Sequence, residues 1–332
     1  MSSAILNSPA SHDAGIFFDR AGAHPRHLLG LDGMPREAIL DLLDMAERYR
    51  SAALAGARFS DELRGVEICN AFFEDSTRTR VSFELAEKRL GASVTTITES
   101  GSSISKGETL LDTLCTVVAM GVDLVVVRHR SPGLPAYLAR HLGAGVINAG
   151  DGEHEHPTQG LLDLMTLRHA WKGRFEGRRM ALIGDIAHSR VARSAIFGLT
   201  TLGAEVVVAG PRTLVPDHLE SLGCRVAPTA DDAMAGADAV MALRLQRERV
   251  EPGLLPPPAE YTRLWAIDAR RVALMKPDAV VLHPGPMNRG IEIRPEVADG
   301  PRSRILNQVE NGVAVRCAVL VSLARAAVET VQ

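Results

Sequence analysis

The sequence predicts an α/β protein of two domains, each a mainly parallel sheet flanked by helices. Three observations support this prediction. Helical and strand patterns alternate along the chain, polar clusters follow the strands, and 332 residues are enough for two hydrophobic cores. An apolar content of 46% with 23% charged residues is that of an ordinary globular protein.

The expected strands are short apolar runs, and the expected helices have apolar residues that recur every three or four positions. In the first half, strands are expected at 27–29, 66–73, 94–97, 124–128 and 146–148, and helices at 36–55, 81–90 and 109–120. In the second half, strands are expected at 179–184, 205–209, 239–243, 266–267 and 279–282, and a helix at 190–202. A helix that begins near residue 162 is expected to bridge the halves.

The chain is expected to divide into three parts. Residues 1–26, rich in Ser, Ala, His and Gly, are predicted to be a disordered extension. The first domain is predicted to comprise 27–157 together with 311–332, because the apolar helix near 313–330 can pack back on it; the second domain is then 158–310. The segment 252–260 contains four prolines and is predicted to be a surface loop.

Charge and cysteine usage exclude several classes of protein. A net charge of −3 gives no general attraction to nucleic acid or to an anionic membrane, so any anion binding must be local. Four cysteines (Cys69, Cys115, Cys224 and Cys317) show no metal-ligand spacing and are expected to be buried free thiols in a reducing compartment. No apolar stretch is long enough to span a membrane and no signal-peptide pattern opens the chain, so we expect a cytoplasmic protein.

The run Ser76-Thr77-Arg78-Thr79-Arg80, placed between a strand and a helix, is the most informative motif. A helix start has unpaired N–H groups and a partial positive charge, which suit a phosphate-sized anion. Arginine adds a planar fork for such an anion. A simple Ser/Thr cap with solvated arginines is the alternative, but three hydroxyls and two guanidinium groups within five residues favour an anion site.

A second polar cluster contains Ser102, Ser103 and Lys106 between Gly101 and Gly107. The flanking glycines indicate a mobile loop whose lysine and hydroxyls could close on an anion. A flexible, solvated loop without a function is the alternative, and the sequence of this segment alone does not decide between them.

Two further clusters follow strands of the first half. Arg128 begins an Arg-His-Arg run at the end of a strand, where a ligand role is favoured over a surface charge cluster. His156 and Gln159 follow a turn rich in Gly and Asp. His154 and His156 do not indicate a metal, because no cysteine lies near them and the sequence has no second acidic-histidine cluster. A neutral histidine that hydrogen-bonds a carbonyl oxygen is favoured instead.

The second half has a strand–loop–helix junction at 184–190 that lacks the Gly-x-Gly-x-x-Gly pattern of dinucleotide sites. Arg190 at the helix start is suited to a carboxylate. Arg244 and Gln246 follow another strand and share one side if the backbone stays extended. The charged run 247–249 is interpreted as a salt-bridged surface.

The turn His283-Pro284-Gly285-Pro286 ends the predicted strand 279–282. Two prolines around a glycine make a rigid turn that can aim backbone carbonyls at a ligand, and a tight turn without a ligand is the alternative. Ligands of open parallel sheets gather beyond the carboxyl ends of the strands. We therefore expect these polar clusters to line one crevice.

Taken together, these motifs resemble the catalytic chains of the aspartate carbamoyltransferases, within the aspartate/ornithine carbamoyltransferase family. The resemblance runs in order through 72–84, 102–113, 128–129, 149–163, 184–190, 244–249 and 283–290. Ornithine enzymes typically have a His-Cys-Leu-Pro turn, whereas this chain has His-Pro-Gly-Pro at 283–286 and also has Lys106. Both differences favour aspartate, and another amine acceptor such as ornithine remains the alternative.

The resemblance implies transfer of the carbamoyl group of carbamoyl phosphate to the amine of L-aspartate, with release of phosphate, in pyrimidine synthesis. It implies a carbamoyl-phosphate-binding first domain, with the ligands Ser76, Thr77, Arg78, Thr79, Arg128, His156, Gln159, Pro284 and Gly285. Catalytic polarisation of the carbamoyl oxygen falls to Thr79, Arg128 and His156. The second domain would bind aspartate, whose implied ligands are Lys106, Arg190, Arg244 and Gln246.

The resemblance also implies a homotrimer with shared active sites. Lys106 and either Ser102 or Ser103 would enter the site of the neighbouring subunit. A regulatory chain or a dihydroorotase is a possible further partner, and no metal or cofactor is expected. Two other classes are disfavoured: a non-catalytic scaffold, because the catalytic residues are present, and a dinucleotide-dependent dehydrogenase, because the glycine fingerprint is missing.

Overall fold

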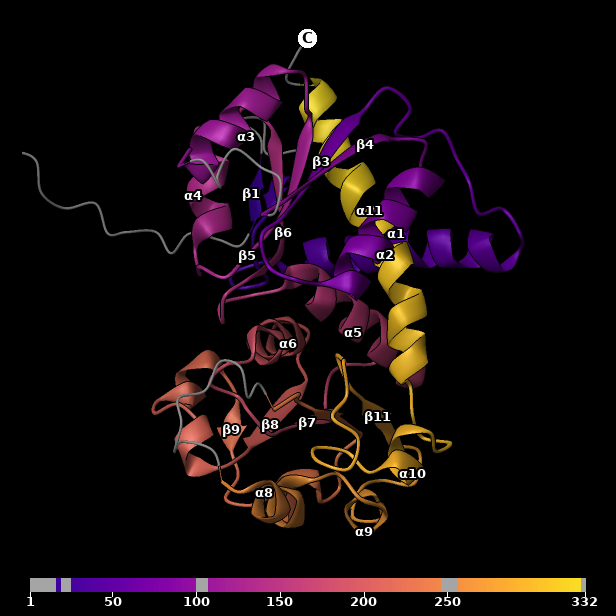
Figure 1. The fold of residues 1–332 in the computed structure, drawn as a ribbon. Helices are drawn as coiled ribbons and strands as arrows, with labels where there is room; N and C mark the ends of the chain where they lie inside the picture. The colour runs from indigo at the N-terminus through magenta and orange to yellow at the C-terminus, as the bar shows by residue number, and fades with distance from the viewer. Residues whose placement is uncertain (1–15, 19–24, 100–106, 246–255, 330–332) are drawn as a thin grey trace, which may run out of the picture.

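The computed structural model describes residues 16–18, 25–99, 107–245 and 256–329. Figure 1 shows two units, each built around its own sheet, with helices packed between and around them. In the described ranges, no helix combines the length and the apolar content needed to cross a membrane. The prediction of two parallel-sheet units flanked by helices is confirmed.

The first sheet has the strand order β1-β2-β6-β5-β3-β4. Its strands are β1 (Ile16–Phe18), β2 (Pro25–Leu28), β3 (Glu67–Phe72), β4 (Ser93–Thr98), β5 (Leu124–His129) and β6 (Gly145–Asp151). All neighbours pair in parallel except β1, which is antiparallel to β2. The apolar runs of β5 and β6 are buried on both faces, as strands between two helix layers must be.

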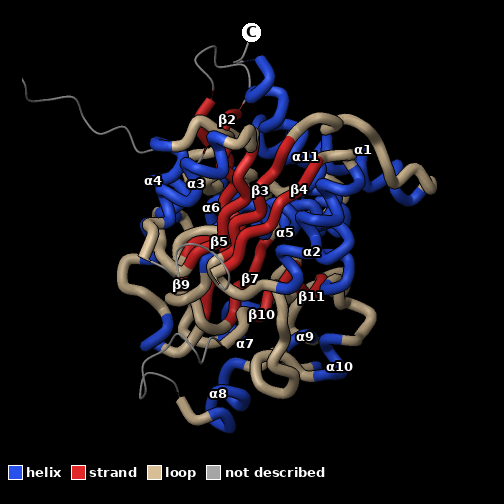
Figure 2. Tube along the Cα trace, turned by 45° about the horizontal axis from the view of Figure 1, so that its top comes forward, coloured by secondary structure: helices blue, strands red, loops and turns tan. Residues whose placement is uncertain are grey.

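Alternate residues of these strands enter different helix layers, because side chains alternate across a strand. Val125 and Val127 pack with α3 (Leu110–Ala119) and α4 (Leu134–His141). Val126 enters the core that holds α1 (Arg36–Leu54), α2 (Thr77–Arg89) and α11 (Ile305–Glu329). Figure 2 shows β3, β4 and β5 of this sheet side by side, with α3 and α4 to their left and α2 and α11 to their right.

The second sheet is parallel throughout, with the order β11-β10-β7-β8-β9. Its strands are β7 (Arg179–Ile183), β8 (Glu205–Ala209), β9 (Arg225–Val226), β10 (Ala239–Ala242) and β11 (Val280–Leu282). One face packs on α6 (Arg190–Thr201). The other face is covered by the short helices α7 (Ala230–Met234), α9 (Ala269–Val272) and α10 (Pro295–Ala298).

Two helices join the units. α5 (Pro157–Ala170) is buried along most of its length, between α6 and α11. α11 leaves the second unit and returns along α1 and α2 of the first, which Figure 1 shows as the yellow helix. The predicted return of the C-terminal helix is therefore confirmed, although the helix starts at Ile305 rather than near residue 313. α5 likewise begins at Pro157, five residues before the predicted start at 162.

Some predictions for individual segments were wrong. Ile267 forms only an isolated bridge with Ile293, so 266–267 is not a strand. Residues 16–18 form β1 and residues 25–26 open β2, so this part of the predicted extension is strand, while 1–15 and 19–24 lie outside the described residues. Cys115 is exposed, although the other three cysteines are buried as predicted.

The proline-rich segment at 252–260 is not entirely a loop. α8 (Pro258–Trp265) begins within it, with Pro258 at the first helical position. Proline has no N–H to donate and its φ is already helical, so it is favoured at the first position of a helix. The rest of the segment up to residue 255 lies outside the described residues.

Candidate active site

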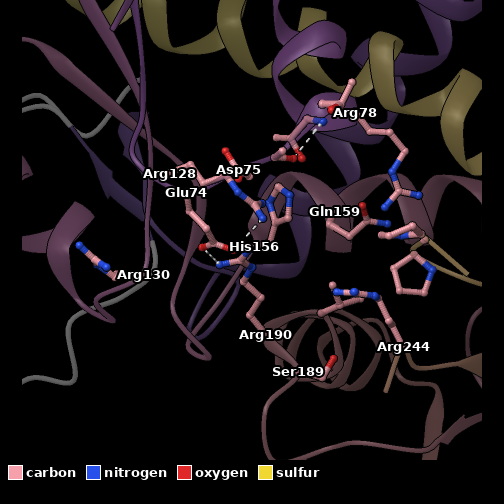
Figure 3. A pocket seen from close by; sticks show the side chains of 17 residues that line it. Glu74, Asp75, Arg78, Arg128, Arg130, His156, Gln159, Ser189, Arg190 and Arg244 are labelled. Atoms are coloured by element: carbon pink, nitrogen blue, oxygen red, sulfur yellow. Dashed lines mark hydrogen bonds and ion pairs between the residues drawn. The ribbon is translucent and has the colours of Figure 1, made fainter. Parts of the chain in front are cut away.

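A cavity of about 720 Å³ lies between the two units, and Figure 3 shows the side chains that line it. Its walls come from the start of α2, the end of β5, the starts of α5 and α6, and the segments that follow β10 and β11. Each of these places lies at or just beyond the carboxyl end of a parallel strand. The crevice predicted from the strand-end clusters is therefore present as one cavity.

The Ser76–Arg80 run forms the N-terminus of α2. Ser76 is the N-cap residue, and its Oγ accepts a hydrogen bond from the Thr79 N–H at 3.3 Å. Ser76 therefore caps the helix, and the same residues also line the cavity, where a helix N-terminus favours an anion. Arg78 points into the cavity as well. Arg80 lies outside the residues that line it and is near Glu84 at 3.7 Å.

Glu74 is a site residue that the sequence reasoning missed. Its carboxylate accepts from Arg128 Nη2 at 3.0 Å and from both terminal nitrogens of Arg190, at 2.9 and 2.8 Å. Arg190 also donates to the Gly152 carbonyl at 3.1 Å. Glu74 follows β3 of the first unit and Arg190 opens α6 of the second, so this ion pair spans the cavity between the units (Figure 3).

His156 occupies the N-cap position of α5, where its backbone N–H donates to Ser194 Oγ at 2.9 Å. Burial, followed by the charges of Arg128 and Arg190, lowers the pKa of His156 well below the usual value. The ring is therefore neutral near pH 7, as the sequence predicted for this position. Its Nδ1 is buried and has no hydrogen-bond partner within the described part of the chain.

The turn after β11 completes the wall opposite the α2 terminus. Gly285 has φ 62°, a conformation that favours glycine, and its N–H donates to His283 Nδ1 at 2.7 Å. A Cβ at this position would overlap the guanidinium group of Arg78. Because Gly285 has no Cβ, the turn of the second unit can lie close to Arg78 of the first.

The cavity brings together most of the site residues predicted from the sequence: Ser76, Thr77, Arg78, Thr79, Arg128, His156, Gln159, Arg190, Arg244, Pro284 and Gly285. Four others, Ser102, Ser103, Lys106 and Gln246, lie outside the described residues. The sequence reasoning did not select Glu74, Asp75 and Ser189, which also line the cavity. Two acidic residues directly before an arginine-rich helix start were the only available signal for the first two.

Positive charge dominates the cavity. Five arginines line it against two carboxylates, and one of those carboxylates is already shared by Arg128 and Arg190. Burial, and then the charge of Arg244, lowers the pKa of the Arg78 guanidinium group. A site of this kind attracts anionic ligands and is suited to stabilising negative charge that develops during a reaction.

The fold and the cavity together define an α/β enzyme of two parallel-sheet units with a cationic site for small anions. Residues 26–169 match the carbamoyl-P binding domain, and residues 176–323 the Asp/Orn binding domain, of aspartate/ornithine carbamoyltransferases. The chain therefore belongs to the aspartate/ornithine carbamoyltransferase family, which confirms the resemblance seen in its motifs.

Individual relatives are similar over nearly the whole chain. The aspartate carbamoyltransferase catalytic subunit of Sorangium cellulosum is 55% identical, over 92% of this chain and 94% of the relative. That of Gluconobacter oxydans is 54% identical, over 91% and 96%. Among solved structures, aspartate transcarbamoylase from Trypanosoma cruzi with N-(phosphonacetyl)-L-aspartic acid is 31% identical, covers 89% of this chain and 94% of that one, and has a TM-score of 0.79.

Proposed function

We propose that this chain is an aspartate carbamoyltransferase catalytic subunit. It transfers the carbamoyl group of carbamoyl phosphate to the amine of L-aspartate and releases phosphate, an early step of pyrimidine biosynthesis. The observation that carries the proposal is the convergence of a helix N-terminus, four of the arginines and a neutral histidine in one cavity. The names of the relatives at 55% and 54% identity support aspartate as the acceptor.

The donor binds at the start of α2. Its phosphate takes hydrogen bonds from the free N–H groups of the helix start and from Ser76, Thr77, Arg78 and Thr79, with Arg128 beside them. Gln159 and the backbone around Pro284 and Gly285 hold the carbamoyl amide. In this proposal, residues 27–157 with 311–332 form the carbamoyl-phosphate domain and residues 158–310 form the aspartate domain.

Attack by the aspartate amine forms a C–N bond at the carbamoyl carbon. The C–O bond to phosphate breaks, phosphate leaves with that electron pair, and it can carry the proton that the amine loses. Thr79, Arg128 and the neutral His156 donate hydrogen bonds to the carbamoyl oxygen as negative charge develops on it. Phosphate is a good leaving group, so positioning and charge stabilisation carry the reaction without a covalent intermediate.

The acceptor binds on the side of the second unit. Arg190, Arg244 and Gln246 take the two aspartate carboxylates, and Lys106 of a neighbouring subunit contributes to the same site. Arg190 is held by Glu74 with both terminal nitrogens, so the acceptor meets a guanidinium group whose orientation is already fixed.

We further propose a cytoplasmic homotrimer with shared sites, in which Ser102 or Ser103 accompanies Lys106. Two exposed apolar side chains support a second copy as partner: Val94 on the edge strand β4, 38% exposed, and Met120 at the end of α3, 78% exposed. Lys106 lies between these two elements in the sequence. We propose a regulatory chain or a dihydroorotase as a further partner of this trimer, and neither nucleic acid nor a membrane is an expected partner. 

The purified protein should form N-carbamoyl-L-aspartate from carbamoyl phosphate and L-aspartate, measured as the ureido product over time. Arg78→Ala should lower kcat/KM by about a hundredfold or more, because it removes a cation from the phosphate site. Arg80→Ala is the matched control on the same helix turn and should retain activity. Faster turnover of ornithine than of aspartate, or equal activity of the two arginine variants, would contradict the proposal.

A further inference from the structure

A buried polar network lies behind the cavity and, among the described residues, makes no contact with the reacting groups of the proposed mechanism except through Gln159 and the 283–285 turn. Asp163 lies on α5, one helical turn after Gln159, and is 2% exposed; its Oδ1 accepts from Gln159 Nε2 at 2.9 Å. The same Oδ1 accepts from Gln308 Nε2 of α11 at 2.7 Å. Gln308 in turn accepts the backbone N–H of His283 at 2.9 Å through Oε1. One carboxylate oxygen therefore joins the two units through three elements.

The orientation of each amide in this network follows from simple hydrogen-bond chemistry. A backbone N–H can only donate, so Gln308 must turn its oxygen toward His283 and its NH₂ toward Asp163. Asp163 Oδ1 is then an acceptor, and Gln159 must present its own NH₂ to it. The amide oxygen of Gln159 is left as the acceptor that this side chain offers to a ligand in the cavity it lines (Figure 3).

The network also reaches the turn on the opposite wall. His283 Nδ1 accepts the Gly285 N–H at 2.7 Å, so His283 Nε2 carries the proton and donates to Glu292 at 3.1 Å. The backbone that includes Pro284 and Gly285 is thereby tied to Gln308 and, through it, to Asp163. Gln159 and this turn are the two groups proposed to hold the carbamoyl amide, and the network fixes one relative to the other.

We propose that Asp163 is a positioning residue for the carbamoyl donor: it turns the Gln159 oxygen toward the donor NH₂ and, through Gln308, sets that oxygen relative to the 283–285 turn. This inference rests on the proposed function, because it needs a carbamoyl amide at Gln159. The second oxygen of Asp163, Oδ2, has no hydrogen-bond partner in the described part of the chain. Oδ1 alone therefore does the positioning.

The test compares two donors that differ only at the group Gln159 is meant to recognise. Acetyl phosphate has a methyl group where carbamoyl phosphate has NH₂, so the ratio of the acetyl phosphate inhibition constant to the carbamoyl phosphate KM measures recognition of that NH₂. Asp163→Leu removes the acceptor at similar volume. It should lower the ratio about fivefold to tenfold, the range expected for one hydrogen bond.

Three further variants make the result specific. Asp163→Asn keeps an oxygen at Oδ1 and replaces only the unpartnered Oδ2, so it should restore the wild-type ratio. Thr166→Val is the matched control: it removes a buried acceptor of the Asn311 amide, at 2.9 Å, between the same two helices and away from Gln159. It should leave the ratio unchanged. Gln159→Ala should lower the ratio as Asp163→Leu does, and the double variant should lower it no further.

The possible failures are distinguishable. Loss of discrimination in Gln159→Ala but not in Asp163→Leu would overturn the positioning role and leave the proposed function standing. Unchanged discrimination in Gln159→Ala would overturn the proposed contact of Gln159 with the donor, and the inference with it. An equal loss in Thr166→Val would show a general packing effect and also overturn the inference. If thermal unfolding shows that Asp163→Leu is not folded, Asp163→Ala takes its place and should lower the ratio in the same way.

Discussion

Glu74 offers a sharp test of how the two units form one site. Its carboxylate holds Arg128 of the first unit and both terminal nitrogens of Arg190 in the second. Glu74→Gln keeps the shape of the side chain and removes the charge. We expect kcat/KM for aspartate to fall because the two arginines lose their common anchor.

The magnitude follows from the environment of the carboxylate. Its side chain is 20% exposed and those of Arg128 and Arg190 are 10% and 6% exposed, so the ion pairs are mostly shielded from water. Breaking a buried pair costs about 3–5 kcal/mol, and the partial exposure places this one at or below the lower end. If most of about 3 kcal/mol is lost from the positioning of the arginines, kcat/KM falls by about a hundredfold, with tenfold as a lower bound.

Binding of a simple anion should change in the opposite direction and become stronger, because the variant removes a negative charge from the cavity. The variant leaves five arginines against one carboxylate in the cavity, so inorganic phosphate should inhibit more strongly. The assay is initial-rate kinetics with aspartate varied and phosphate as inhibitor. Asp75→Asn is the control, because Asp75 lines the same cavity and makes no ion pair within the described residues. A loss below threefold in Glu74→Gln, or weaker inhibition by phosphate, would refute this reasoning.

Three other predictions concern stability and assembly. Burial lowers the pKa of His27 to about 4, so the free energy of unfolding should be highest above pH 6.5 and fall as the pH drops from 6.5 to 4; His27→Asn should flatten this dependence in denaturant titrations. Gly160→Ala should lower stability by about 1–3 kcal/mol in thermal unfolding, although alanine is the better helix former, because its Cβ would meet Leu31, which follows β2, and Ser194 of α6; an increase would contradict the packing. Met120→Asp should shift sedimentation toward smaller species and reduce activity with them, whereas an unchanged mass would argue against α3 as a subunit contact.

Local signals predicted much of the fold. Strands 124–128 and 205–209 were placed within a residue of β5 and β8, because apolar runs buried between helix layers are distinctive in sequence. Segment 266–267 was mistaken for a strand because its two apolar residues are buried for another reason: Ile267 packs with Ile293 in the second core. The short helices α7, α9 and α10 were missed, since four or five residues carry too little periodicity.

Part of the candidate site was also predictable from local signals in the sequence. Ser76 and His156 lie at helix starts that follow strands, and a parallel sheet brings such positions to one edge. The partner of Arg190 was not predictable. Glu74 is 116 residues away in the sequence, and no local pattern gives the distance between the two units. The roles of Lys106 and Gln246 remain predictions.

The sequence by itself determined the alternation of elements, the capped helix start at Ser76 and the excess of arginine near strand ends, because capping and periodicity act over a few residues. Only the tertiary structure decided which polar groups meet: Glu74 with Arg190, and Asp163 with Gln308 across 145 residues. Those contacts depend on the placement of two sheets and of the helices between them. A hydrogen bond requires atoms within about 3 Å, and no local pattern fixes a distance of that kind between segments so far apart in the chain.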